Sequence, residues 1–168
     1  MNGKNNRGFS LIELLIVVAL IGVIAAIAVP NLLASKRAAN EASALAALRI
    51  ISSAEATYQS TGGGGQYGDL AALDNSRLVD VVVGAATIGG GVPKSGYLFS
   101  AENISGVGVP AFDAKGQPSV HTTTSIISGT GSRSFFVNES GVIYYNSTAT
   151  APTCTADETR AVTGTHLN

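Results

Sequence analysis

The sequence predicts an α+β fold in which a long, extended N-terminal helix packs on a small C-terminal antiparallel β-sheet. Three observations predict it. Residues 9–30 form an almost uninterrupted apolar run, and residues 31–61 contain no glycine or proline and carry apolar side chains at helical spacing. Beyond Gly62, short runs of β-branched and aromatic residues alternate with Gly, Pro and Ser, which is typical of strands and turns.

The apolar run contains one charged residue, Glu13. Its length suffices to cross a bilayer as a helix, which takes about 20 residues. An ionised carboxylate inside such a segment costs on the order of 3 kcal/mol, so Glu13 predicts a functional role with a partner. The alternative is that its side chain reaches the headgroups from near the end of the helix.

A short basic segment, residues 1–8 (MNGKNNRG), precedes the apolar run. Its positive charges, Lys4 and Arg7, predict that it stays on the cytoplasmic side of a membrane and that the C-terminal part is exported. An ordinary secretory signal would have the same polarity, with cleavage after Ala28. The carboxylate and the length of the apolar run weigh against that alternative.

The junction Gly8, Phe9, Ser10, Leu11, Ile12, Glu13, followed by LLIVVALIGVIAAIAVPN, resembles the class III leader and N-terminal helix of type IV pilins and pseudopilins. The resemblance implies that a membrane prepilin peptidase cuts between Gly8 and Phe9 and that the new amine of Phe9 is methylated. It also implies that Glu13 meets this amine on a neighbouring subunit during assembly.

This role of Glu13 has a physical basis. An amine and a carboxylate are each costly in an apolar setting and tolerable together, so their pairing rewards one register between two chains. A head-to-tail contact of this kind does not close on itself, and it generates a helical filament. The alternative is that Glu13 caps the amine of its own helix.

Four segments are expected: a cleaved leader (1–8), a transmembrane and filament-core helix (9–30), an amphipathic helix half (31–61) and a globular β-rich domain (62–168). Pro30 predicts a kink or local unwinding of the helix. The amphipathic half should face the domain through one stripe: Ala44, Ala47, Leu48, Ile51, Ala54 and Tyr58. Leu45 and Ile50 lie off the stripe, either as subunit contacts or as ordinary surface residues.

The remaining elements follow from turn and strand signals. The glycines of residues 61–65 end the helix, and residues 66–76 hold a short helical turn with Leu70 and Leu73. Residues 138–141 form a hairpin turn that ends in Gly141. Strands are predicted at residues 78–83, 96–100, 120–127, 134–137 and 142–145.

Enzymatic and metal-dependent functions find little support. His121 and His166 lie in no catalytic motif, and His121 is interpreted as a polar strand residue. The widely spaced Asp69, Asp74, Asp80 and Asp113 could include calcium ligands but fit solvated loop carboxylates better. No cofactor is expected. A net charge of −1 indicates no specific nucleic-acid site.

The single cysteine, Cys154, cannot form an intramolecular disulfide. Here the sequence departs from many pilins, whose C-terminal region is stapled by two cysteines. Cys154 is an inert thiol, a covalent or lipid attachment point, or an intermolecular bridge.

The resemblance implies a structural subunit of a type IV pilus, serving adhesion, twitching motility or DNA uptake. Its partners would be copies of itself, the prepilin peptidase and N-methyltransferase, the inner-membrane pilus assembly machinery and, before assembly, the bacterial inner membrane. The chain would be a single-pass inner-membrane precursor and then part of an extracellular filament. A type II secretion pseudopilin and a secreted binding domain with an ordinary signal peptide are the alternatives, with an exported enzyme last.

Overall fold

The computed structural model describes residues 9–104, 108–125, 127–155 and 160–167. The chain divides into two compact units, Met1–Ser35 and Lys36–Asn168. Helix α1 (Leu11–Ser60) supplies the helix of the first unit and the longest element of the second. The expected α+β fold, a long N-terminal helix on a small antiparallel sheet, is confirmed.

Helix α1 continues through Pro30 without a break. The residues on both sides of Pro30 are helical, so the local unwinding considered above is absent. A proline removes one backbone hydrogen bond but does not end a helix that is strongly favoured on either side. A bend at Pro30 stays a prediction.

In the second unit, α1 buries the predicted stripe. Five of its six members are buried, and Tyr58 is partly buried against the same core. Leu45 also packs partly on this core, so it is not the free surface residue that its position off the stripe indicated, whereas Ile50 is 47% exposed. Two acids, Glu41 and Glu55, lie on the buried face as well, and the sequence analysis missed them.

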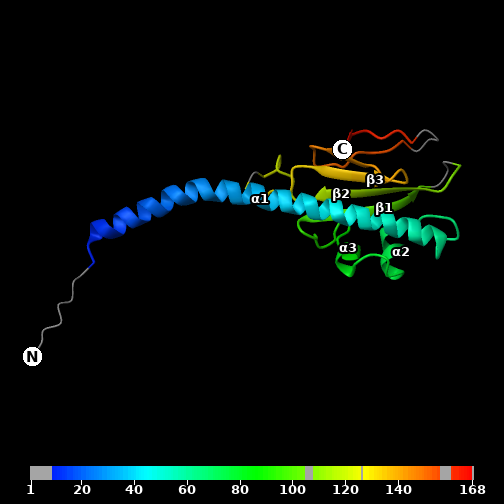
Figure 1. The fold of residues 1–168 in the computed structure, drawn as a ribbon, viewed down its shortest axis with the longest axis horizontal. Helices are drawn as coiled ribbons and strands as arrows, with labels where there is room; N and C mark the ends of the chain where they lie inside the picture. The colour runs from blue at the N-terminus through cyan, green and yellow to red at the C-terminus, as the bar shows by residue number, and fades with distance from the viewer. Residues whose placement is uncertain (1–8, 105–107, 126, 156–159, 168) are drawn as a thin grey trace, which may run out of the picture. The chain divides into compact units, whose positions relative to one another are not determined.

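Among the described residues, five antiparallel strands form one sheet in the order β1-β2-β3-β4-β5. Figure 1 shows the second part of α1 running along the first strands of this sheet. The strands are β1 (Tyr97–Ile104), β2 (Ala111–Pro118), β3 (Ser134–Asn138), β4 (Ile143–Asn146) and β5 (Thr165–His166).

The core lies between the sheet and α1. Phe99 of β1 and Phe135 of β3 are fully buried there with Leu48 of α1. Gly116 of β2 permits this packing, because a Cβ at that position would lie 3.2 Å from the Phe99 ring and 3.4 Å from Leu48 Cδ1. A side chain on β2 would therefore push helix and sheet apart.

The other face of β3 is covered by the C-terminal segment. Phe136 points to this face and is fully buried. On the same face, the Ser134 hydroxyl donates to the Thr148 carbonyl at 2.6 Å, and Pro152 of the same segment is fully buried. A sheet with both faces covered explains why all five residues of β3 are buried.

Two predicted strands are wrong. Residues 78–83 lead instead into the short helix α3 (Val81–Ala85), because Asp80 caps it by accepting the Val82 N–H at 3.3 Å. In 120–127, His121 forms only an isolated bridge to Gly131, and the Thr124 N–H turns back to the His121 carbonyl. Ile126 lies outside the described residues.

The other local predictions are confirmed. Helix α2 (Leu70–Asn75) is the short helical turn, and β1, β3 and β4 correspond to the remaining three strands. Gly64 and Gly65 after α1 have φ of 59° and 91°, and Gly141 in the hairpin turn has φ of 72°. The sequence analysis did not predict β2 or β5, since β2 contains no β-branched residue and β5 is only two residues long.

Candidate functional site

The first unit presents an apolar helical surface without a partner. Every residue from 9 to 32 is exposed, including Phe9 at 77%. By length and composition alone, α1 is able to cross a membrane, and none of its most apolar window is buried. An uncovered apolar surface of this size requires lipid or other protein around it.

Glu13 is bound within its own helix. Its Oε2 accepts the backbone N–H of Ser10 at 2.9 Å. Because α1 begins at Leu11, Ser10 is the N-cap residue and Glu13 stands at the third helical position, as in a capping box. Among the described residues, no other hydrogen bond or ion pair involves Glu13. The spacing of Ser10 and Glu13 could have revealed this cap from sequence.

Of the other residues predicted to act in processing and assembly, Phe9 is exposed beside the start of α1 and Pro30 lies inside it. Gly8 lies outside the described residues. Within the described part of this segment, which begins at Phe9, the direct hydrogen bond of Glu13 is to Ser10.

A buried acid, Glu41, ties α1 to the loop before β3. Its Oε1 accepts the Ser132 N–H at 2.9 Å and the Ser132 hydroxyl at 2.7 Å, and its Oε2 accepts from Arg133 Nη2 at 2.7 Å. Burial alone would raise its pKa, but these hydrogen bonds and the charge of Arg133 together lower the pKa below its usual value. Its position three residues before Ala44, on the apolar stripe, was the signal in the sequence.

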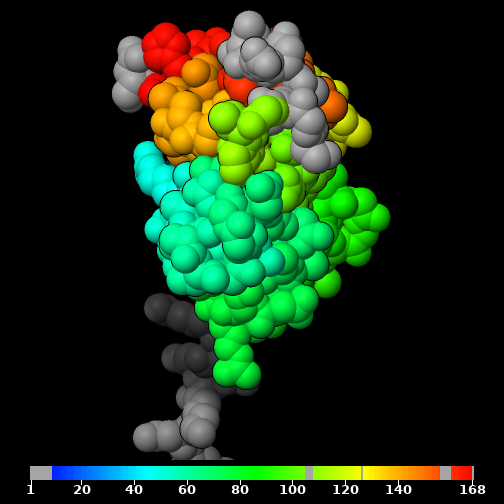
Figure 2. Space-filling model, turned by 90° about the vertical axis from the view of Figure 1, so that its right-hand side faces the viewer, coloured from blue at the N-terminus to red at the C-terminus, as the bar shows by residue number. Residues whose placement is uncertain are grey.

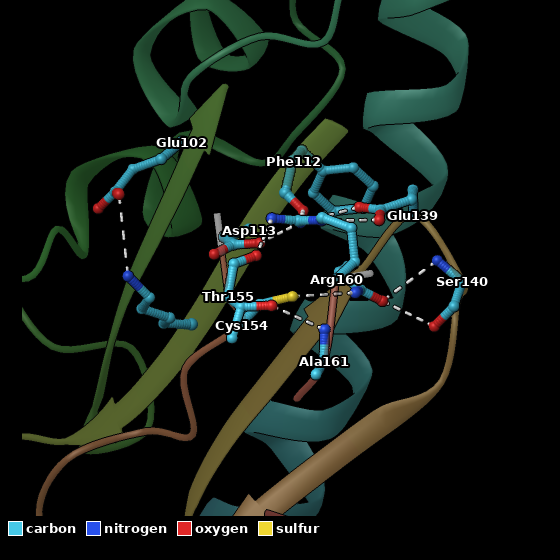
Figure 3. A network of polar contacts seen from close by, with 11 residues as sticks. Glu102, Phe112, Asp113, Glu139, Ser140, Cys154, Thr155, Arg160 and Ala161 are labelled. Atoms are coloured by element: carbon cyan, nitrogen blue, oxygen red, sulfur yellow. Dashed lines mark hydrogen bonds and ion pairs between the residues drawn. The ribbon is translucent and has the colours of Figure 1, made fainter. Parts of the chain in front are cut away.

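A second set of polar contacts, the Arg160 network, holds the C-terminal segment (Figure 3). Arg160 donates from Nη2 to Asp113 of β2 and from Nε to Glu139 of the β3–β4 turn, the latter at 2.9 Å. It also donates to the Phe112 carbonyl at 3.0 Å. The side chains of Arg160 and Asp113 are only 10% and 8% exposed. The Arg160 network thus joins three distant parts of the chain without a disulfide.

The charged groups of the Arg160 network shift one another's pKa values. Burial raises the pKa of Asp113 by more than Arg160 lowers it. For Glu139, burial acts in the same direction, but the hydrogen bonds and charge of Arg160 lead to a net lowering of the pKa. Asp113 is therefore harder to ionise here than in water, and the loss of Arg160 would leave that carboxylate unpaired.

Cys154 is a free, partly buried thiol next to this network. The amide of Asn138 donates to its Sγ at 3.8 Å, and burial raises the pKa of the thiol. A raised pKa reduces the reactive thiolate fraction, which favours the inert interpretation over attachment or bridging.

His121 has a structural role in the second unit. Its Nδ1 accepts the Thr123 N–H at 3.1 Å, and therefore Nε2 donates to the Ser132 carbonyl at 2.9 Å. His121 is buried and lies outside the named strands, so its interpretation as a polar strand residue is wrong. His166 lies in β5.

The four aspartates have separate surroundings. Asp69 and Asp80 cap α2 and α3, and Asp74 lies in α2 with its carboxyl beside Gly84. Asp113 is buried in β2 and binds Arg160, so its interpretation as a solvated loop carboxylate is wrong. Among the described residues, no group of three or more His, Cys, Asp or Glu side chains is placed to hold a metal ion.

The fold and the N-terminal segment define a class: a small α+β domain joined to an exposed apolar helix that is suited to membrane anchoring. Residues 3–29 match the family model of the prokaryotic N-terminal methylation motif. This match and the relatives described next show that the N-terminal part of the chain is similar to that of type IV pilins.

Two relatives show the similarity in detail. The chain is 55% identical over 38 residues to the type IV wide pilus major component PilA4 of Thermus thermophilus, across 23% of this chain and 29% of that protein. It is 43% identical over 53 residues to the type IV major pilin protein PilA of Myxococcus xanthus, across 32% of this chain and 24% of that protein. The match thus spans less than a third of either relative. No solved structure shows a significant match.

Proposed function

We propose that this chain is a structural subunit of a type IV pilus, made as a precursor and polymerised through its N-terminal helix. A prepilin peptidase removes residues 1–8, and the amine of Phe9 is methylated. Residues 9–30 hold the chain in the inner membrane as a single-pass protein until the assembly machinery transfers it to the extracellular filament. In this scheme, residues 1–8 are the leader and residues 9–30 the core helix. Residues 31–61 are the amphipathic half of the helix, and residues 62–168 are the globular domain.

The main observation behind this proposal is the exposed apolar surface of residues 9–32, which has a single acid near its start. Burial of apolar surface is favourable by about 25 cal/mol per Å². This helix therefore has a strong tendency to leave water, first for lipid and then for the helices of other subunits. The matched methylation motif, residues 3–29, spans Phe9 and most of this surface, which supports processing at Phe9.

The capping contact of Glu13 is compatible with assembly. The Ser10 N–H occupies Oε2, so Oε1 is available to the amine of another subunit. Cleavage before Phe9 leaves the Ser10 N–H in place and adds the amine. In this scheme the cap orients the carboxylate, and the neighbouring amine selects the register between the two chains.

The alternatives have less support. Both relatives are named as pilus components, which favours a pilus over a type II secretion pseudopilin. Their names also favour a non-enzymatic role. Adhesion, twitching motility and DNA uptake are the proposed uses of the filament.

The processing step has a direct test. Mass analysis of the N-terminal peptide from purified filaments should find a chain that begins with methylated Phe9. Gly8→Leu should leave the leader attached, because a bulky side chain replaces the glycine at the proposed cut, whereas Gly3→Leu in the same leader should still be processed. A mature chain that begins at Val29 would establish an ordinary signal peptide instead and would overturn the proposed function.

A further inference from the structure

Glu55 of α1 is a buried acid with an incomplete set of partners. Its side chain is fully buried, and Oε2 accepts the backbone N–H of Gly68 at 2.9 Å. Oε1 has no hydrogen-bond partner among the described residues. Buried carboxyl groups are normally paired, since an unpaired charge away from water is costly.

The contact with Gly68 holds a segment that folds back on the end of α1. Within this segment, residues 61–69, the Gly63 N–H donates to the Tyr58 carbonyl at 2.7 Å and the Gly65 N–H to the Gln59 carbonyl at 3.0 Å. A Cβ at Gly63 or Gly68 would lie 2.9 or 3.2 Å from the Tyr58 ring. Figure 2 looks at this end of the second unit, where the teal to green atoms form one continuous surface.

The charged groups around Glu55 oppose its ionisation. Asp69 follows Gly68 directly, and its charge acts on Glu55. Tyr67 of the same segment lies in the field of both Glu55 and Glu139, the latter from the β3–β4 turn. Among the described residues, no cation forms an ion pair with Glu55. The surroundings therefore favour the neutral carboxyl.

We propose that the Glu55 carboxyl is a proton-operated latch: with its proton it holds residues 61–69 against α1, and when the proton passes to water the segment is released. The neutral carboxyl tolerates full burial and still accepts the Gly68 N–H through its carbonyl oxygen. The ionised carboxylate requires further donors or water, which the closed segment does not provide. The latch depends on the second unit alone and is independent of the proposed function.

The pH range of the latch follows from the pKa. Burial is the main cause that raises the pKa of Glu55, and together with the charge of Asp69 it outweighs the Gly68 N–H and raises the pKa from 4.5 to about 7. The folded state then binds the proton more tightly than the unfolded state. Its stabilising effect is fully present below the ordinary value and is lost as the pH rises through the raised pKa.

Hydrogen exchange of the full chain in detergent micelles tests the latch. Peptides that cover residues 59–69 are followed between about pH 4 and pH 8, with rates corrected for the intrinsic pH dependence. In the wild type, protection should be constant below the ordinary pKa of 4.5 and should fall by up to about tenfold per pH unit from there to the raised pKa of about 7, because opening releases one proton in this range. Above the raised pKa the carboxyl is ionised in both states, and protection should be constant again at its low value. Glu55→Gln should keep its protection throughout, since the amide carbonyl still accepts the Gly68 N–H and cannot ionise.

Two further variants sharpen the result. Asp69→Asn keeps a capping side chain for α2 but removes the nearby charge, so the midpoint should move to lower pH. Glu102→Gln removes an exposed acid of β1 and should behave as the wild type. An equal loss of protection in the wild type and in Glu55→Gln would overturn the latch.

A measurement on the wild type alone covers the case in which Glu55→Gln does not fold. The ¹³C shift of the Glu55 carboxyl should titrate with a midpoint near 7, the value to which burial raises its pKa. A midpoint at the ordinary value of 4.5 would also overturn the latch.

Discussion

Glu13→Gln should insert into the membrane normally but yield at least about tenfold less sheared filament. A tenfold loss corresponds to about 1.4 kcal/mol per contact between subunits, which is modest for a charge pair in an apolar setting. Glutamine keeps the cap, because its side-chain oxygen accepts the Ser10 N–H as Glu13 does at 2.9 Å. Immunoblots of the sheared and membrane fractions measure the effect.

Two matched variants separate the cap from the charge. Ser10→Pro removes the backbone N–H that Glu13 accepts and keeps the carboxylate, so its filament yield should stay close to that of the wild type. Glu13→Ala removes both cap and charge and should be at least as defective as Glu13→Gln. Normal filament yield from Glu13→Gln would show that capping is the whole role of this residue.

The second large effect is expected at Arg160. Arg160→Leu should lower the free energy of unfolding of the second unit by about 3–5 kcal/mol, because it leaves the buried Asp113 carboxylate without its partner. The side chain of Asp113 is 8% exposed, so water cannot fully replace the lost contact. Thermal unfolding of the full chain in detergent, followed by the near-UV circular dichroism of the buried Tyr97 and the partly buried tyrosines, measures the loss.

Two control variants test whether the loss in Arg160→Leu comes from the unpaired Asp113 carboxylate. Arg49→Leu removes an exposed arginine of α1 and should change stability little. Adding Asp113→Asn to Arg160→Leu should recover part of the loss, because the neutral amide no longer leaves a buried charge unpaired. Unchanged stability in Arg160→Leu would show that the Arg160 network does not hold the C-terminal segment.

A fall in pH should change the stabilising contributions of the two carboxylates of the Arg160 network in opposite directions. The lowered pKa of Glu139 means that its contribution to stability is present above the ordinary value and is lost as the pH falls through the lowered one. The raised pKa of Asp113 means that its contribution to stability is present below the ordinary value and is lost as the pH rises through the raised one. Because Arg160 causes the lowering at Glu139, Arg160→Leu should also lose this part of the acid sensitivity.

The features predicted correctly from sequence are those with local causes. Helix α1 follows from helical spacing of apolar residues over many turns, and the turn before β4 follows from a glycine able to adopt positive φ at position 141. The motif around Phe9 is also contiguous in sequence. By contrast, valines at 81–83 have a strand preference that was overridden by the cap at Asp80.

The candidate site was predicted unevenly for a related reason. Glu13 stood out because it is the one charge in an apolar run, whereas Glu41 and Glu55 were masked by an otherwise regular stripe. The role of an acid on a buried helix face can be inferred only when its hydrogen-bond or ion-pair partner is known. Those partners, Ser132 and Gly68, come from loops whose course was not predicted.

The sequence by itself determined the apolar helix, its single acid and the resemblance to pilins, because each depends on residues that are close together in the chain. Only the tertiary structure decided that residues 111–118 form a strand, since β2 is held by pairing with β1 and β3 on its two sides. It likewise decided that Arg160 binds Asp113 and Glu139 and that Glu55 is buried next to Gly68. These features depend on contacts between distant residues, and the free energy of such contacts is set by the packing of the whole domain.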